Sequence, residues 1–299
     1  MGHILNQKAS LEKDHQNGLQ KRMKSSRKIS IITPSYNQGN FIEDAIISVM
    51  KQGYSNYEHI IVDGGSTDET LSILRKYPHL IWISEKDKGQ TDALQKALQK
   101  VSGDIIGWLN ADDYYDKNIF FKVVKELNFR NVDAIYANLK YVDINKLLIR
   151  ERISKSSYFL SNKFVSKFIC FIPSTTFFFK REILNEKIYF DKNINFGMDK
   201  DFFANIYHNN FKIKKIETNF AFFRLHENNK FEHKRNINNL INDTKEGILI
   251  YNKYSKLKLP KNIFGFTTYL VIRFFIKILG FLIFNFSKKK LKYENITSS

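Results

Sequence analysis

The sequence predicts an α/β fold in which a mainly parallel sheet is flanked by helices. Short apolar runs rich in β-branched residues alternate with longer amphipathic stretches through the first two-fifths of the chain. That alternation indicates βαβ units, because parallel strands need a helical crossover between them. Gly and Pro are sparse, with 13 and 4 residues among 299, and no repeat or low-complexity linker interrupts the pattern. One continuous domain is therefore expected over residues 28–255.

Four strands are expected in the first part, each a short apolar run bounded by turn residues: Ile29–Thr33, His59–Val62, Leu80–Ile83 and Asp104–Leu109. The helices expected between them are Asn40–Lys51, Asp68–Tyr77 and Gln90–Val101. Residues 132–180 are then rich in strand formers, Gly197–Asn209 has a helical pattern, and Lys212–Leu225 returns to strand-like composition. A polar helix over Glu232–Tyr254 completes the domain.

The positive charge is concentrated at the two ends of the chain. Of the net charge of +18, residues 1–28 carry +5 and residues 255–299 carry +8. A nucleic-acid-binding protein should carry basic and aromatic residues together across its folded core, whereas the middle of this chain is nearly balanced. Nucleic acid is therefore not an expected partner. Residues 1–27 lack the apolar core of a signal peptide and are predicted to be a polar, disordered extension.

The C-terminal segment, residues 256–299, joins an apolar helix to a basic end. Residues 263–286 are apolar apart from Arg273 and Lys277, whose i,i+4 spacing puts both on one helical face. Each cation costs roughly 2.5–3.5 kcal/mol at a bilayer centre, against about 0.3–0.6 kcal/mol returned per large apolar residue, so spanning is not favoured. Residues 263–292 are therefore expected to lie peripherally on the inner, cytoplasmic face of the cell membrane. A core or oligomer-interface helix is the alternative.

Polar, turn-forming clusters follow all four predicted strands. They are IITPSYN at the first strand, DGGSTD after the second, KDKGQTD after the third and NADD after the fourth. Ligands of open α/β sheets bind at the carboxyl ends of the strands, so these clusters predict one ligand site. The glycines of the second cluster would let the backbone approach a planar or phosphate group closely.

The adjacent acids Asp112 and Asp113 indicate the chemistry. Two carboxylates at the end of a buried strand repel each other unless a cation binds beside them. Mg²⁺ and Mn²⁺ are hard ions that take a few carboxylates and fill their other positions with phosphate oxygens. The alternative interpretation is a pair of N-terminal acids ahead of a helix at Lys117–Leu127.

Together these segments resemble the family 2 glycosyltransferases, which have the Rossmann-like GT-A fold. The resemblance runs from about Lys28 to Tyr115 and continues more weakly to about Phe231. It implies an inverting, hexosyltransferase-like enzyme that depends on Mg²⁺ or Mn²⁺ and uses a nucleotide-sugar donor, with a UDP-sugar first among the candidates. It also implies a glycan or lipid-linked acceptor in the assembly of bacterial surface polysaccharide or lipopolysaccharide.

The same resemblance assigns roles to individual residues. Asp112 and Asp113 would form the DXD-like metal motif, with Asp113 as the direct ligand, and His226 would complete the metal shell or contact the diphosphate. Asp63 would accept a hydrogen bond from the base or ribose. The residues implied to bind the nucleotide sugar are Thr33, Pro34, Tyr36, Asn37, Asp63, Gly65, Ser66, Gln90, Asp92, Asn110 and Asp112.

Asp199 is the general base that the resemblance implies, and Asp201 is the second choice. A carboxylate across the sugar from the metal can take the proton of the acceptor alcohol. Both acids would otherwise be ordinary first-turn residues of a helix, and His226 an ordinary surface histidine. The alternative function is a catalytically silent nucleotide-sugar-binding protein, against which the intact Asp112, Asp113 and Asp199 argue.

Overall fold

The computed structural model describes residues 27–129, 131–154, 168, 172–184, 188–227, 229, 237–276 and 278. Within these residues nine strands form one sheet, and helices cover both of its faces. The predicted α/β fold is therefore confirmed. The extension predicted for residues 1–27 lies outside the described residues except for Arg27, and so does the basic run that follows residue 286.

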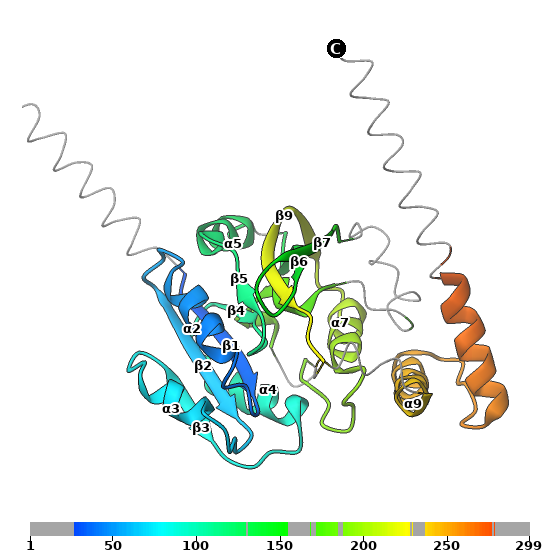
Figure 1. Cartoon of the computed structure of the whole chain (residues 1–299). Helices are drawn as coiled ribbons and strands as arrows, with labels where there is room; N and C mark the ends of the chain where they lie inside the picture. Colours follow the sequence, from blue (N-terminus) through cyan, green and yellow to red (C-terminus); the bar gives the residue numbers. More distant parts are fainter. Residues whose placement is uncertain are drawn as a thin grey trace, which may run out of the picture.

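The first half of the sheet is parallel (Figure 1). Its elements are β1 (Ile29–Ser35), α2 (Ile42–Met50), β2 (Tyr57–Asp63), α3 (Thr70–Arg75), β3 (Ile81–Ser84), α4 (Gln90–Leu98) and β4 (Ile105–Trp108). Every strand and helix expected here is present, within a few residues of its predicted bounds. The carboxyl ends of the four strands therefore meet at one edge of the sheet.

The second half of the sheet mixes strand directions. Its elements are β5 (Tyr114–Tyr115), α5 (Ile119–Leu127), β6 (Ala134–Val142), β7 (Leu148–Arg152), η2 (Ser174–Thr176), β8 (Phe178–Lys180), η3 (Arg181–Ile183), α7 (Met198–His208), β9 (Ile213–Arg224) and α9 (Ile237–Tyr254). The strand order is β3-β2-β1-β4-β8-β6-β9-β5, and β7 pairs with β6. Because β5 pairs antiparallel with β9, Tyr114 opposite Phe222, the end of β9 lies beside the predicted metal motif.

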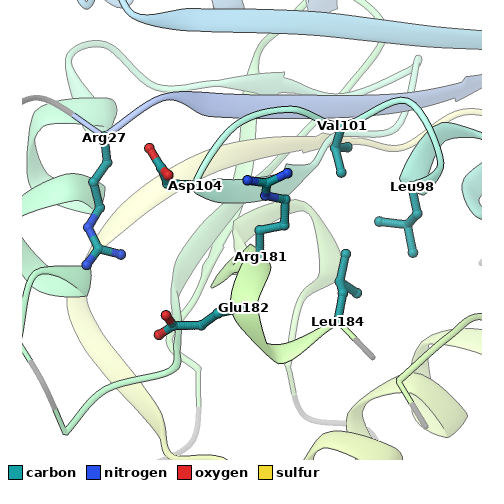
Figure 2. A pocket seen from close by; sticks show the side chains of 7 residues that line it. All are labelled: Arg27, Leu98, Val101, Asp104, Arg181, Glu182 and Leu184. Carbon is teal, nitrogen blue, oxygen red and sulfur yellow. The ribbon is translucent and has the colours of Figure 1, made fainter. Parts of the chain in front are cut away.

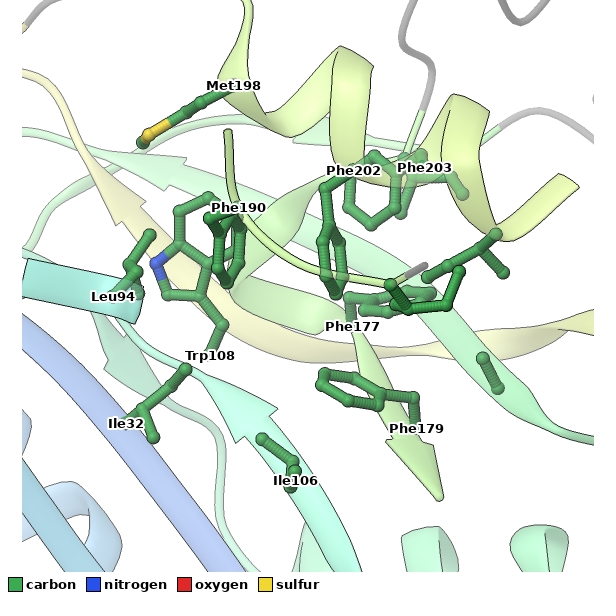
Figure 3. Packing of buried hydrophobic residues seen from close by; sticks show 14 of the residues in the cluster. Ile32, Leu94, Ile106, Trp108, Phe177, Phe179, Phe190, Met198, Phe202 and Phe203 are labelled. Atoms are coloured by element: carbon green, nitrogen blue, oxygen red, sulfur yellow. The ribbon is translucent and has the colours of Figure 1, made fainter. Parts of the chain in front are cut away.

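Two apolar layers hold the helices on the sheet. Successive residues of a strand point to opposite faces, so Ile31 packs with α2 and α5, whereas Ile32 packs with α4 and α7. In the second layer the ring of Phe190 lies 5.3 Å from Trp108 and stacks on Phe202 of α7 at 4.3 Å (Figure 3). These buried rings connect the end of β4 to α7.

A helix at residues 263–276 packs against α9 (Figure 1). Its Tyr269 is fully buried in a cluster with Tyr251 of α9, and Arg273 Nη1 lies 2.5 Å from Oδ2 of Asp243, also on α9. This helix thus forms, with α9, a buried cluster that is separate from the two apolar layers on the sheet. Among the described residues, no helix combines the length and the apolarity that crossing a bilayer requires.

Candidate functional site

Hydrogen bonds tie the loops at the carboxyl edge of the parallel strands to each other. The backbone N of Asn37, after β1, donates to Ser66 Oγ, after β2, at 2.7 Å. Gln90 Nε2, at the start of α4, donates to Asn110 Oδ1, after β4, at 3.0 Å. The clusters that the sequence placed after separate strands therefore form one continuous edge.

Asp63 is the centre of the loop that follows β2. Its carboxylate accepts hydrogen bonds from Gly65 N at 3.1 Å, from Ser66 N at 2.8 Å and from Ser84 Oγ at 2.7 Å, and the Ser66 hydroxyl donates to its other oxygen. Gly65 has a φ of +84°, which suits a residue without a Cβ. The carboxylate of Asp63 is 0% exposed, and its hydrogen bonds shape this loop; the bond to the base or ribose that was expected of Asp63 stays a prediction.

The other residues expected to contact the donor differ in how accessible they are. Tyr36 is 59% exposed just beyond β1, and its ring is available to a ligand. Thr33 and Pro34 are buried within the strand. Asp92 is buried and pairs with Lys192 Nζ at 2.8 Å, and this bond lowers the pKa of Asp92. Tyr36 and the next residue, Asn37, which is also exposed, are therefore presented to solvent, whereas Thr33, Pro34 and Asp92 are not.

Asp113 is completely buried, and the protein supplies three donors to its carboxylate. Thr175 Oγ1 and Asn110 Nδ2 donate to Oδ2 at 2.8 and 3.1 Å, and the backbone N of Arg224 donates to Oδ1 at 3.1 Å. Burial and, secondly, the charge of Asp112 raise the pKa of Asp113 well above its ordinary value. The protein thus encloses the carboxylate of Asp113, and the direct contact with a metal that was expected of it stays a prediction.

Asp112 keeps a partly exposed carboxylate beside two groups from the end of β9. Its Oδ2 lies 3.0 Å from His226 Nε2 and 2.9 Å from Nδ2 of Asn229. Asn229 is buried, and its Oδ1 accepts from the backbone N of His226 at 2.8 Å, which sets the orientation of the amide. Sequence reasoning missed Asn229. The feature of the sequence that could have found it is its position three residues after His226. At this spacing the backbone N of Asn229 donates to the carbonyl of His226 and closes a turn.

A divalent cation fits between Asp112 and His226. The ring Nε2 faces a carboxylate oxygen and the Nδ2 of Asn229, both at 3.0 Å, and it cannot donate to the first while accepting from the second. With Nε2 protonated, both groups donate to Oδ2 of Asp112, and a cation bound by Oδ2 and Nε2 would take the place of that proton. Adjacent ligands of an octahedral ion at about 2.1 Å lie about 3.0 Å apart, which is the separation found here.

This pair supplies only part of a metal shell. Across the described ranges, no three His, Cys, Asp or Glu side chains gather into a group that could hold a metal ion. Mg²⁺ sites are commonly built from one or two carboxylates plus the phosphates of a substrate, and Asp112 supplies one carboxylate here. The donor set therefore suits an ion that arrives with, or is completed by, a diphosphate.

Arg224 links the site to α2, and no separate role was expected for it. Its Nη2 forms a salt bridge with Asp44 Oδ2 at 2.6 Å, and the side chain is 1% exposed. The guanidinium lies 4.8 Å from the ring of Phe41, which in turn lies 4.6 Å from the ring of His226. Arg224 therefore holds His226 and Asp113 in place from behind. The feature of the sequence that could have pointed to Arg224 is its position two residues before His226.

The two acids predicted as alternative bases have different environments in α7. Asp201 is 1% exposed and bonds to Lys253 Nζ at 2.9 Å and Tyr254 OH at 3.0 Å. Burial raises the pKa of Asp201, although both partners oppose that shift. Asp199 is half-buried in the first turn, and within the described part of the chain its carboxylate accepts only from the backbone N of Lys200, at 2.7 Å. Asp199 is thus the more available of the two.

The start of α7 contacts the start of α4. Thr91, in the first turn of α4, donates to the carbonyl of Ile194 at 2.8 Å and contacts Met198 Sδ at 3.1 Å. The preceding residue, Gln90, is the one that reaches the loop after β4. These contacts place the N-terminus of α7, and Asp199 with it, at the same edge of the sheet as the candidate metal ligands.

A surface depression of about 580 Å³ lies at the opposite edge of the sheet, where β1 and β4 begin. Figure 2 shows its charged and apolar lining residues, which are Arg27, Leu98, Val101, Asp104, Arg181, Glu182 and Leu184. Asp104 accepts from the backbone N of Lys28 at 2.9 Å, which joins the two strand starts. Because ligands of such sheets bind at the carboxyl edge, this depression is separate from the candidate site.

Residues 30–187, more than half of the chain, match the model of Glycosyl transferase family 2. TuaG of Bacillus subtilis, named for teichuronic acid biosynthesis, is 38% identical over 107 residues, which are 34% of this chain and 41% of TuaG. An uncharacterized glycosyltransferase of Nostoc sp. is 28% identical over 212 residues, which are 67% of this chain and 65% of that protein. The chain spans less than two thirds of the length of each of these relatives.

Two solved structures share the fold. TarS of S. aureus, residues 1–349 in complex with UDP-GlcNAc, has a TM-score of 0.54 at 20% identity and covers 77% of this chain and 74% of that one. The mannosyltransferase PcManGT of Pyrobaculum calidifontis, in complex with GDP-Man and Mn²⁺, has a TM-score of 0.59 at 19% identity over 77% and 65%. The predicted GT-A fold is thereby confirmed, and with the family model matching more than half of its length, the chain belongs to glycosyl transferase family 2.

Proposed function

We propose that this protein is a metal-dependent, inverting glycosyltransferase that moves a sugar from a UDP-sugar to an acceptor hydroxyl in surface polysaccharide assembly. The observation that carries the proposal is the pair Asp112–His226, 3.0 Å apart at the edge of the sheet where ligands bind. The neighbours bound to UDP-GlcNAc and to GDP-Man with Mn²⁺ support the donor class and the metal. The biosynthetic name of TuaG supports the polysaccharide.

Asp112 and His226 would hold Mg²⁺ or Mn²⁺ against the diphosphate of the donor. A bound ion would supply positive charge that stabilises the negative charge developing on the leaving nucleotide. Asp113 holds the backbone of this loop through the three donors described above. The exposed ring of Tyr36 offers the nucleobase a face on which to stack.

Asp199 would take the proton of the acceptor hydroxyl. The acceptor oxygen then forms a bond to the anomeric carbon on the side opposite the diphosphate, and the bond between that carbon and the phosphate oxygen breaks. The nucleoside diphosphate leaves with the electron pair, and one such displacement inverts the anomeric configuration. Asp199 contributes by orientation and by accepting the proton as the new bond forms.

A nucleotide-release assay tests this function. The purified chain is incubated with a panel of UDP-, dTDP- and GDP-sugars and lipid-linked saccharides, in Mn²⁺ and in EDTA. We expect nucleotide release from a UDP-sugar that needs both Mn²⁺ and an acceptor, with product of inverted anomeric configuration. Donor binding without turnover would instead support the silent binding protein, and equal turnover in EDTA would contradict the role of the metal.

We further propose that the helix at residues 263–276 rests on the cytoplasmic surface of an anionic membrane and so brings the site to a lipid-linked acceptor. The face of this helix away from α9 carries large apolar side chains that are each at least 47% exposed, namely Ile263, Phe264, Val271, Phe274 and Phe275. The chain continues into the cationic sequence SKKKLK, which suits anionic lipid. Arg273, expected to line a cationic stripe, instead pairs with α9, so the exposed face is more apolar than expected.

Replacing Phe274 and Phe275 with serine should abolish flotation with vesicles of anionic lipid and leave the melting temperature nearly unchanged, because both rings are exposed. The matched control replaces Phe121 and Phe129, which are 56% and 54% exposed on and just after α5. The control should float like the unmodified protein. Equal flotation of both variants, or none by the unmodified chain, would contradict membrane docking through this face.

A further inference from the structure

We propose that Glu246 of α9 is a positioning residue for Asp199, holding the N-terminal end of α7 in place from a neighbouring helix. The proposal rests on the proposed function, in which Asp199 is the general base. Neither membership of the family nor the pair Asp112–His226 requires a role for Glu246, because α9 lies beyond the residues that match the family model.

Glu246 accepts three backbone hydrogen bonds from the residues that lead into α7. Oε1 accepts from Asn195 N at 3.0 Å, and Oε2 accepts from Phe196 N at 2.7 Å and from Gly197 N at 2.8 Å. The first N–H groups of a helix have no partner within it, and Gly197, the N-cap of α7, has no side chain to supply one. Bonds from N–H groups to a carboxylate are stronger than neutral ones, so α9 fixes this end of α7 firmly.

This arrangement leaves the carboxylate of Asp199 for the substrate. An acid in the first turn of a helix commonly turns back to bond the free N–H groups at that helix end. Here Glu246 already occupies the three N–H groups that precede α7, and Asp199 accepts only from Lys200 N among the described residues. Glu246 therefore fixes the turn from which Asp199 projects, and Oδ2 of Asp199 keeps no partner among the described residues.

A second contact braces the same two helices from the C-terminal side. Tyr269, in the helix at 263–276, lies directly against Gly247, the neighbour of Glu246, where a Cβ would overlap its hydroxyl. The same hydroxyl accepts from Lys200 Nζ, next to Asp199, at 3.0 Å. In Figure 1, α9 accordingly lies between α7 and the C-terminal helix. Both α9 and the helix at residues 263–276 thus support the first turn of α7, which carries Asp199.

Glu246→Gln tests the positioning role, because glutamine keeps the size of the side chain but can accept on one side only. We expect kcat to fall by about 10- to 100-fold, since a misplacement of about 1 Å can cost about 10²-fold in rate. The Kd for UDP in Mn²⁺ and the KM for the donor should stay within about twofold, because Asp112 and His226 are untouched. Glu182→Gln is the matched control, as Glu182 is 68% exposed on η3 and should leave kcat unchanged.

The double variant Asp199→Asn/Glu246→Gln separates positioning from general weakening of the fold. If Glu246 acts through Asp199, the double variant should turn over no more slowly than Asp199→Asn alone. Multiplied losses, an unchanged kcat in Glu246→Gln, or a parallel loss of UDP affinity would overturn the proposal. Absence of turnover in the unmodified chain, with UDP bound, would contradict the proposed function itself and is recognised before any variant is measured.

Discussion

Replacing Asp112 with asparagine is expected to abolish metal-dependent donor binding and to lower turnover by at least about 10³-fold. Asparagine keeps the shape of the side chain but removes the negative charge, so His226 alone would have to hold the ion. A catalytic ion contributes several kcal/mol of charge stabilisation, and about 4 kcal/mol corresponds to 10³-fold in rate. Calorimetric titration of UDP with and without Mn²⁺, together with nucleotide release, measures both effects.

The neighbouring variant Asp113→Asn shows which of the two acids contacts the ion. Its carboxylate is buried and accepts from three donors, so the change is expected to cost about 1–3 kcal/mol of unfolding free energy while metal-dependent UDP binding persists. Asp116→Asn is the matched control, because Asp116 accepts only from its neighbour Lys117 through its side chain in the described structure. Loss of metal binding in Asp113→Asn, with Asp112→Asn unaffected, would restore Asp113 as the direct ligand.

Asp199→Asn is expected to keep the affinity for UDP and Mn²⁺ and to lose about 10²–10⁴-fold in kcat. That range is typical of a missing general base, because asparagine cannot accept the proton of the acceptor. The carboxylate has one backbone donor among the described residues, so the substitution should change the melting temperature little. Steady-state kinetics with varied acceptor, alongside calorimetry of nucleotide binding, separates the two quantities.

Asp201→Asn provides the contrast. Asp201 is buried and bonded to Lys253 and Tyr254, so its replacement should lower the unfolding free energy by roughly 1–3 kcal/mol. Its kcat should fall far less than that of Asp199→Asn once folded protein is compared. The reverse pattern, a stable Asp201 variant without turnover and an active Asp199 variant, would assign the proton transfer to Asp201.

The parallel half of the fold could be predicted because its elements are local. The strands β1, β2 and β4 are short apolar runs that end in turn residues. Between these runs the apolar residues recur at the spacing of an amphipathic helix. The polar clusters in the loops could be predicted as one site for the same reason, because parallel strands bring the loops that follow them to one edge of the sheet. What the sequence could not show was the face of residues 263–276 that packs: an apolar helix looks the same whether α9 or a bilayer covers it, and the ion pair of Arg273 decides the orientation.

The division of labour between the two adjacent acids also lay beyond sequence reasoning. Asp112 and Asp113 differ because Thr175 and Arg224 surround the second, and both partners come from distant parts of the chain. Asn229 was missed for a similar reason: an asparagine in a polar stretch has no special signal until its turn folds onto Asp112. Burial and hydrogen-bond partners are tertiary properties, and they alone distinguish the partly exposed carboxylate of Asp112 from the enclosed one of Asp113.

The candidate site is assembled from contacts of very large sequence separation. Arg224 meets Asp44 across 180 residues, and His226 meets Asp112 across 114. Such contacts close long loops of chain, and the entropy of loop closure must be overcome before they stabilise the fold. A nascent chain that has emerged to residue 187 holds every position matched by the family model, yet it lacks both His226 and the arginine behind it. The candidate site can therefore form only after synthesis has passed residue 229, and truncated products would fold, at most, into a scaffold that lacks the contact between Asp112 and His226.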